Sequence, residues 1–244
     1  METRPTADGC RNPIVSRTNV VIRGVIIDFG GVLAVPPSPE ALLRLQRVSR
    51  FDDADAFFRT WRRHRLAYDI GDVSADEFWR LVGSEAGRAY DAAVLSQLCV
   101  EDAACWAVPN TELAAWLQAL RAEGLRLALL SNMPREQWAA LKDGLAWLSA
   151  CDVVVLSYEI GLAKPNPEIY RRCLDQMAMR PDEVLFIDDQ PDNITAAMKL
   201  GLNALRFTTI EDLRRELAAG YNGIPLPATS AFPHKGGSRG DSPR

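Results

Sequence analysis

The chain has 244 residues, of which 48% are hydrophobic and 25% charged, as in a globular protein with one large core or a core and a small second domain. The net charge of -4 argues against an electrostatic surface for nucleic acid, and no stretch approaches the roughly 20 apolar residues of a membrane helix. The N-terminal segment lacks a signal-peptide pattern, and the five cysteines form no CxxC pair. We therefore expect a cytoplasmic protein with reduced thiols.

Both ends of the chain are polar and are interrupted by proline and glycine. Residues 1–19 and 225–244 offer too little apolar surface to offset the entropy that is lost on ordering. We therefore predict that both segments are disordered.

Five short runs rich in Val, Ile and Leu predict strands, because continuous apolar runs are typical of strands buried on both faces of a parallel sheet. In chain order, the runs cover residues 20–28, 126–131, 153–157, 184–188 and 204–207. Helical stretches separate them. Asn166 and Pro167 fit an N-cap and a first helical position, and Asp192 or Asn193 can cap the helix after the fourth run. Alternating strands and helices predict a doubly wound, Rossmann-like α/β domain.

The segment 36–108 differs from the rest of the chain, because it shows helical spacing throughout and no convincing strand. We predict a small all-helical domain that is inserted after the first strand. Residues 20–35 and 109–224 are then left to form the α/β core.

Functional-looking side chains collect where the predicted strands end or just beyond. In an open parallel sheet, ligands bind at the carboxyl ends of the strands, so these side chains predict a single site. They are Asp28 after the first strand, Ser131 and Asn132 after the second, Lys164 in the loop after the third, and Asp188 and Asp189 after the fourth.

These residue types suit attack on a phosphate. An attacking carboxylate and a phosphate repel each other, by roughly 4 kcal/mol for two unit charges about 4 Å apart at an effective dielectric constant of 20. Asp188 and Asp189 could hold one Mg²⁺ together with Asp28, because Mg²⁺ prefers a few carboxylates plus water and substrate oxygens. Lys164 would add positive charge, and Ser131 a hydrogen bond to a transferring oxygen. The first carboxylate would then form an aspartyl-phosphate that water hydrolyses.

Four strings in this order, IIDFGGVL, LALLSNMP, GLAKPNPEIY and VLFIDDQPDN, resemble the motifs of the haloacid-dehalogenase-like (HAD) superfamily. The resemblance covers about residues 22–210. It implies a Rossmann-like core with a helical cap and Mg²⁺-dependent hydrolysis of a small phosphorylated metabolite, such as a sugar phosphate. It is strongest to the branch with α-D-glucose-1-phosphate phosphatases and the phosphatase domain of soluble epoxide hydrolases.

The resemblance also implies individual roles. It matches Asp28 to the nucleophile, Ser131 to the second motif, Lys164 to the third and the Asp188–Asp189 pair to the metal-binding fourth. Ser131, Asn132 and Lys164 are then the predicted substrate-binding residues. In this family, the carbonyl two residues after the nucleophile, here that of Gly30, also binds the metal.

One position departs from the family pattern. Its phosphatases usually carry a second Asp, the general acid and base, where this chain has Gly30. The glucose-1-phosphatase branch shares the substitution. We hypothesise that the enzyme favours leaving groups that need little protonation, such as anomeric or acyl phosphates, or takes an acid from the cap. The HRLAYDIGD turn offers His64, Arg65, Tyr68 and Asp72 as candidates for substrate contact, with helix-surface positions as the competing interpretation.

Two other functions stay open. A 2-haloacid dehalogenase would use Asp28 to displace halide without a metal, although the paired acids at 188 and 189 count against it. A non-catalytic binding or regulatory module would have lost turnover together with the second Asp, and Gly30 is the feature that favours it.

Overall fold

The computed structural model of the chain describes residues 21–228, so the disorder predicted for 1–19 and for most of 225–244 lies outside the described residues. Within that range, the carbonyl of Pro225 accepts a 2.6 Å hydrogen bond from the indole Nε1 of Trp116. The predicted tail is therefore attached to the core where it begins.

Five parallel strands form one sheet in the order β3-β2-β1-β4-β5. They are β1 (Gly24–Ile27), β2 (Arg126–Ser131), β3 (Val153–Leu156), β4 (Val184–Asp188) and β5 (Asn203–Arg206). The predicted α/β class is confirmed, with β1 at the centre of the sheet. The first strand is shorter than predicted, and Asp28 follows its last residue.

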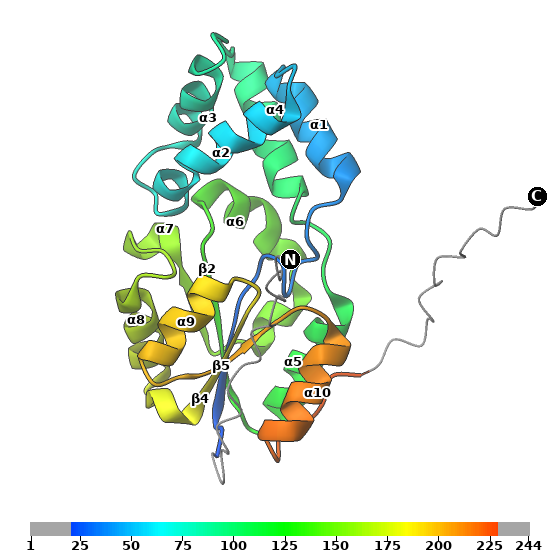
Figure 1. Cartoon of the computed structure of the whole chain (residues 1–244), viewed down its shortest axis with the longest axis vertical. Coiled ribbons are helices and arrows are strands. Elements are labelled where there is room, and N and C mark those ends of the chain that lie inside the picture. The colour runs from blue at the N-terminus through cyan, green and yellow to red at the C-terminus, as the bar shows by residue number, and fades with distance from the viewer. Residues whose placement is uncertain (1–20, 229–244) are drawn as a thin grey trace, which may run out of the picture.

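Helices cover both faces of the sheet (Figure 1). In β1, Val25 and Ile27 face the layer that contains α5 (Thr111–Ala122) and α10 (Ile210–Gly220). Ile26 faces the opposite layer, which contains α8 (Pro167–Met177) and α9 (Pro191–Lys199). All three side chains are fully buried, which explains why the strand reads as a continuous apolar run. The core helices are α5 (Thr111–Ala122), α6 (Arg135–Leu141), α7 (Ser157–Ile160), α8 (Pro167–Met177), α9 (Pro191–Lys199) and α10 (Ile210–Gly220), with 3₁₀ turns η1 (Lys142–Gly144), η2 (Ala146–Ala150) and η3 (Pro181–Glu183).

Four further helices, which we call the helical insert, lie between β1 and α5 and enclose a hydrophobic cluster of their own. Phe57, Phe78 and Trp79 are its fully buried aromatic side chains. A capping box between Ser74 and Glu77 fixes the start of the third helix. Figure 1 shows the insert as a separate layer at the top, beyond the carboxyl ends of the strands. Its helices are α1 (Pro39–Ser49), α2 (Ala54–Asp69), α3 (Ala75–Ser84) and α4 (Ala92–Ala104).

The two linkers of the insert run side by side where they join the core. The backbone N–H of Val35 donates to the carbonyl of Val108 at 2.8 Å. The N–H of Asn110 donates to the carbonyl of Leu33, also at 2.8 Å. The insert is therefore attached through a short antiparallel ribbon that begins close to Asp28.

A buried arginine also joins the insert to the core. Arg65 of α2 donates to Asp69 at 2.7 Å and to the two oxygens of Asp102 on α4 at 3.0 and 2.9 Å. Its Nη2 reaches the core, where Oε1 of Gln137 on α6 accepts a 2.7 Å hydrogen bond. Burial raises the pKa of both aspartates, against the opposing effect of the arginine. This candidate for substrate contact therefore directs its nitrogens at protein groups.

Replacement of Gln137 by Ala is expected to lower the free energy of unfolding by about 1.5–3 kcal/mol, the usual contribution of a hydrogen bond to a charged group. The loss arises because Arg65 keeps its charge but loses its partner in the core. Urea denaturation measures it. Gln118→Ala on the exposed side of α5 is the matched control and should stay within about 0.5 kcal/mol of the parent. Equal free energies of unfolding for the two variants would show that the hydrogen bond of Arg65 with Gln137 does not stabilise the protein.

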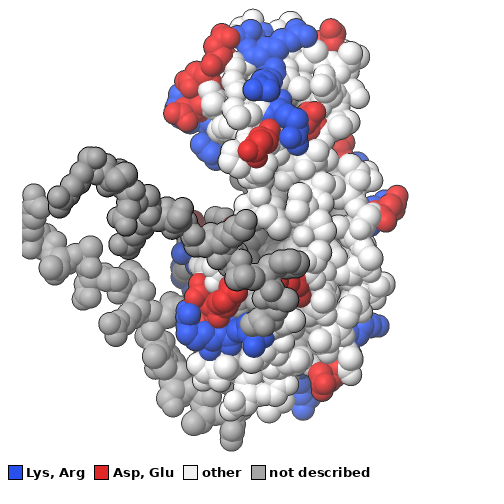
Figure 2. Space-filling view, turned by 90° about the vertical axis from the view of Figure 1, so that its right-hand side faces the viewer, with Lys and Arg blue, Asp and Glu red and all other residues white. Residues whose placement is uncertain are grey.

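Charged side chains of both signs lie on the face drawn in Figure 2. Lys and Arg side chains alternate with Asp and Glu over the end formed by the insert, and uncharged residues cover much of the core. Within residues 21–228, no helix is long and apolar enough to span a bilayer.

Candidate active site

The sheet brings Asp28 and Asp188 next to each other. The strands β1 and β4 are hydrogen-bonded neighbours, and Ile27 is in register with Ile187. The residue that follows each of these two positions is an aspartate, so both carboxylates stand at the same level of the carboxyl edge. Asp28 is 7% exposed and Asp188 is fully buried.

A lysine lies between the two carboxylates. The Nζ of Lys164 is 2.7 Å from Oδ1 of Asp28 and 2.7 Å from Oδ2 of Asp188, and its side chain is 1% exposed. The Asn132 side chain fixes the backbone of this lysine. Its Oδ1 accepts from the lysine N–H at 2.8 Å, and its Nδ2 donates to the lysine carbonyl at 2.9 Å. The end of β2 thereby positions the loop after β3.

Two groups at the start of α9 orient Asp188. The side-chain amide of Asn193 donates to both carboxylate oxygens, at 2.9 and 3.0 Å, and the backbone N–H of Gln190 donates to Oδ1 at 2.8 Å. The predicted cap at residue 192 or 193 is wrong, because α9 begins at Pro191. The proline fixes φ for the first turn, which leaves the asparagine amide available to the carboxylate.

The three carboxylates can reach one cation. Oxygens of Asp28, Asp188 and Asp189 lie within 4.8 Å of one another. The loop makes room for this arrangement at Gly31, where φ is +77° and a Cβ would lie 2.7 Å from Oδ2 of Asp189. Three carboxylates and one lysine leave an excess of negative charge in a largely buried place. Hard oxygen donors of this kind fit Mg²⁺, so the residues present suit the ion that the sequence predicts.

The titration of these groups reflects the shortage of positive charge. Burial raises the pKa of Asp28 to about 7; Asp188 raises it as well, while Lys164 lowers it. Burial and then the charge of Asp188 raise the pKa of Asp189. For Lys164, burial alone would lower the pKa, but the two neighbouring carboxylates raise it overall. A divalent cation would favour the ionised carboxylates.

The second motif supplies a hydroxyl at the same edge. Ser131 is the last residue of β2, is 2% exposed and pairs with Leu156 of β3. Its hydroxyl makes no hydrogen bond within the described part of the chain. The hydroxyl is thus available to an oxygen of a bound ligand.

The segment that follows the helical insert places against Gly30 a side chain that the sequence gives no reason to select. Trp106 lies between α4 and α5, and its ring faces Gly30, where a Cβ would come within 3.1 Å of Cζ3. Of the sequence candidates from the insert, His64 and Tyr68 are engaged elsewhere, and Asp72 is an exposed residue just after α2. His64 contacts Glu85 at 2.7 Å, and Tyr68 is 2% exposed and stacked on Phe78.

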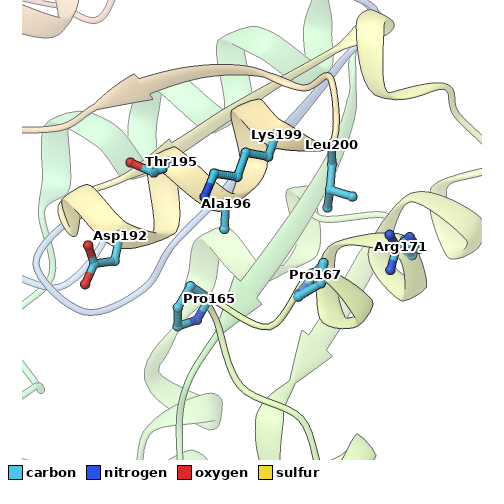
Figure 3. A pocket seen from close by; sticks show the side chains of 8 residues that line it. All are labelled: Pro165, Pro167, Arg171, Asp192, Thr195, Ala196, Lys199 and Leu200. Carbon is cyan, nitrogen blue, oxygen red and sulfur yellow. The ribbon is translucent and has the colours of Figure 1, made fainter.

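A groove of about 520 Å³ lies on the outer side of α8 and α9 (Figure 3). Its walls include Pro165, Arg171 and Lys199, but none of the three site carboxylates. The groove is therefore separate from the place where the carboxylates meet.

A family model described as haloacid dehalogenase-like hydrolase matches residues 22–201. The chain belongs to this family. The match confirms the resemblance that the four ordered motifs indicate.

Two curated relatives are similar over most of the chain. The D-ribitol-5-phosphate phosphatase of Bacteroides thetaiotaomicron is 28% identical over 225 residues, which cover 83% of this chain and 100% of that protein. The acyl-CoA dehydrogenase family member 10 of Mus musculus is 29% identical over 215 residues. These cover 84% of this chain, which spans only 19% of that longer protein.

A solved HAD family enzyme from Bacteroides thetaiotaomicron, in complex with magnesium and inorganic phosphate, has the same fold. Its TM-score is 0.62 at 23% identity, with 77% of this chain and 94% of that chain covered.

Proposed function

We propose that this protein is a Mg²⁺-dependent phosphatase that hydrolyses a small phosphorylated metabolite through an aspartyl-phosphate. The observation that carries the proposal is the buried group of Asp28, Lys164, Asp188 and Asp189 at the carboxyl edge of the sheet. The relative that is named D-ribitol-5-phosphate phosphatase and the HAD family enzyme solved with magnesium and phosphate support it.

The contacts of Asp28 indicate which of its oxygens attacks. Oδ1 accepts hydrogen bonds from the N–H of Phe29 at 2.7 Å and from Lys164 at 2.7 Å. Oδ2 has no hydrogen bond within residues 21–228, so it keeps its lone pairs for phosphorus. The bond from Oδ2 to phosphorus forms as the bond from phosphorus to the leaving oxygen breaks. Water then attacks phosphorus, which releases inorganic phosphate and the carboxylate.

The remaining residues offset charge and hold positions. A bound Mg²⁺ would supply positive charge shared between the phosphoryl oxygens and the carboxylates of Asp28, Asp188 and Asp189, with the carbonyl of Gly30 as the further predicted ligand. Lys164 lies against the nucleophile and offsets its charge. Ser131 would donate to a phosphoryl oxygen.

Asn132, which the sequence predicts to bind substrate, has its amide engaged with the backbone of Lys164. We assign it to positioning that lysine. Gln190 and Asn193 have the corresponding role for Asp188.

A metal-free dehalogenase is the second candidate, since it would use the same nucleophile. The donor set favours the phosphatase, because displacement of halide gives no use for Asp188 and Asp189 beside the nucleophile. A module that only binds ligand would keep the same residues and release no product.

Removal of divalent ions with a chelator is expected to abolish the release of phosphate from para-nitrophenyl phosphate, and added Mg²⁺ should restore it. The reason is that three carboxylates would otherwise repel the phosphate dianion. Inorganic phosphate is measured in both states. Release of chloride from 2-chloropropionate in the chelator would establish the dehalogenase instead. If neither compound, nor any member of a panel of phosphorylated metabolites, gave a product, the result would favour a module that only binds ligand.

A further inference from the structure

Trp106 has an unusual place in the molecule. It packs against both the hydrophobic cluster of the core and that of the helical insert, and within residues 21–228 it is the one partly buried hydrophobic residue that does so. Its six-membered ring faces Gly30. A Cβ on that glycine would lie 3.1 Å from Cζ3, 3.4 Å from Cε3 and 3.6 Å from Cη2.

The indole, and not the backbone, disfavours a side chain at this position, because a Cβ 3.1 Å from Cζ3 is a tight contact. Gly31 has a φ of +77°, which most side chains avoid, but Gly30 lies outside this left-handed region. An alanine would therefore suit the backbone at 30, and the three atoms nearest to its Cβ would belong to the ring. A carboxyl side chain extends further than a Cβ, so it could not stand there unless the indole moved. Packing on two clusters opposes that movement.

We propose that Trp106 takes the place of a side chain at residue 30 and forms the wall against which the leaving group of the substrate packs. This rests on the proposed phosphatase function. The indole is incompletely buried, and its Nε1 has no hydrogen-bond partner among the described residues. It therefore offers an apolar ring with one N–H donor opposite Gly30, which lies two residues beyond the nucleophile.

The replacement defines the class of substrate. When the bond between phosphorus and the leaving oxygen breaks, the electron pair stays on that oxygen. No proton donor at residue 30 can neutralise it, because an indole does not act as an acid near neutral pH. The substrate is thus a phosphate monoester or anhydride whose leaving group carries the charge by itself, such as an acyl, enol, aryl or anomeric oxygen, and whose body packs on the indole.

The test compares para-nitrophenyl phosphate with ethyl phosphate in four proteins: the parent, G30D, W106A and G30D/W106A. A positioned general acid contributes about 10²–10⁴-fold, so the double variant should hydrolyse ethyl phosphate at least about 10-fold faster than W106A does. G30D alone should show no gain, because the indole excludes its carboxyl group. A gain in G30D equal to that of the double variant would overturn the proposal.

Contact with the leaving group is tested separately. W106A should raise KM for para-nitrophenyl phosphate about 3- to 10-fold, as expected for a lost aromatic contact, and leave KM for ethyl phosphate nearly unchanged. W106F, which keeps a ring and disturbs packing less, should restore most of the difference. An equal change in KM for both esters would show that Trp106 acts only through the fold.

A measurement without turnover separates this inference from the proposed function. G30A should lower the melting temperature when Trp106 is present and change it little in a W106F or W106A background, because the neighbour of the new Cβ is smaller or absent. If the changes in melting temperature caused by the two substitutions were additive, the indole would not be what excludes a side chain at residue 30. If the parent hydrolyses neither ester while the effects are non-additive, the phosphatase proposal fails and the exclusion of a side chain at 30 stands.

Discussion

Asp28→Asn is expected to lower kcat for para-nitrophenyl phosphate at least about 10⁴-fold, because an amide oxygen is a poor nucleophile towards phosphorus. The fold should survive, since the amide can still accept hydrogen bonds from Phe29 and Lys164. In the absence of metal, the variant should unfold at the same or a higher temperature than the parent. The substitution removes one of the two carboxylates that share a single lysine.

Steady-state kinetics at saturating Mg²⁺ and thermal unfolding in chelator measure the two effects. Asp143→Asn on the exposed turn η1 is the matched control, because it makes the same chemical change away from the site. It should leave both quantities unchanged. Turnover of the Asp28 variant within about 100-fold of the parent would exclude this residue as the nucleophile.

Lys164→Met is expected to lower the free energy of unfolding by about 3–5 kcal/mol in metal-free protein. The methionine side chain is similar in length to that of lysine and fits the same space. However, the buried Asp28 and Asp188 would lose the cation that lies 2.7 Å from each of them. Activity should fall as well, because the charge of the nucleophile is no longer offset. Saturating Mg²⁺ should recover part of the stability, since bound cation replaces some of the lost positive charge.

Urea denaturation with and without Mg²⁺ provides the comparison. Lys199→Met at the exposed end of α9 replaces a lysine of the surface groove and should cost less than about 0.5 kcal/mol. A Lys164 variant as stable as this control would mean that the two carboxylates are not held as an ionised pair around the lysine.

The sequence predicts the sheet well because burial on both faces leaves a direct pattern. Ile26 and its two neighbours are apolar since helices cover both sides of β1, and the same holds for β4. The site follows from topology, because parallel strands deliver Asp28 and Asp188 to one edge. The Pro167 helix start is also confirmed, since its signal is local.

Contacts between distant segments leave no such pattern. Arg65 meets Gln137 across 72 positions, and neither residue carries a mark of its partner in the sequence. Trp106 reads as one aromatic residue among several, and only the fold places it over Gly30. The start of α9 was mispredicted because Asn193 has the chemistry of a cap, yet the carboxylate of Asp188 lies within its reach.

The antiparallel ribbon at Val35 and Val108 has a consequence for how this architecture diversifies. The two ends of the insert lie one hydrogen bond apart, so the insert can be exchanged there without disturbing a strand of the sheet. The carboxylates of the candidate site come from the sheet below, so such an exchange would keep them and would replace the contacts that the insert makes with the core, such as that of Arg65 with Gln137. Trp106 is carried on the returning arm, so each exchange would also reset what stands beside the nucleophile.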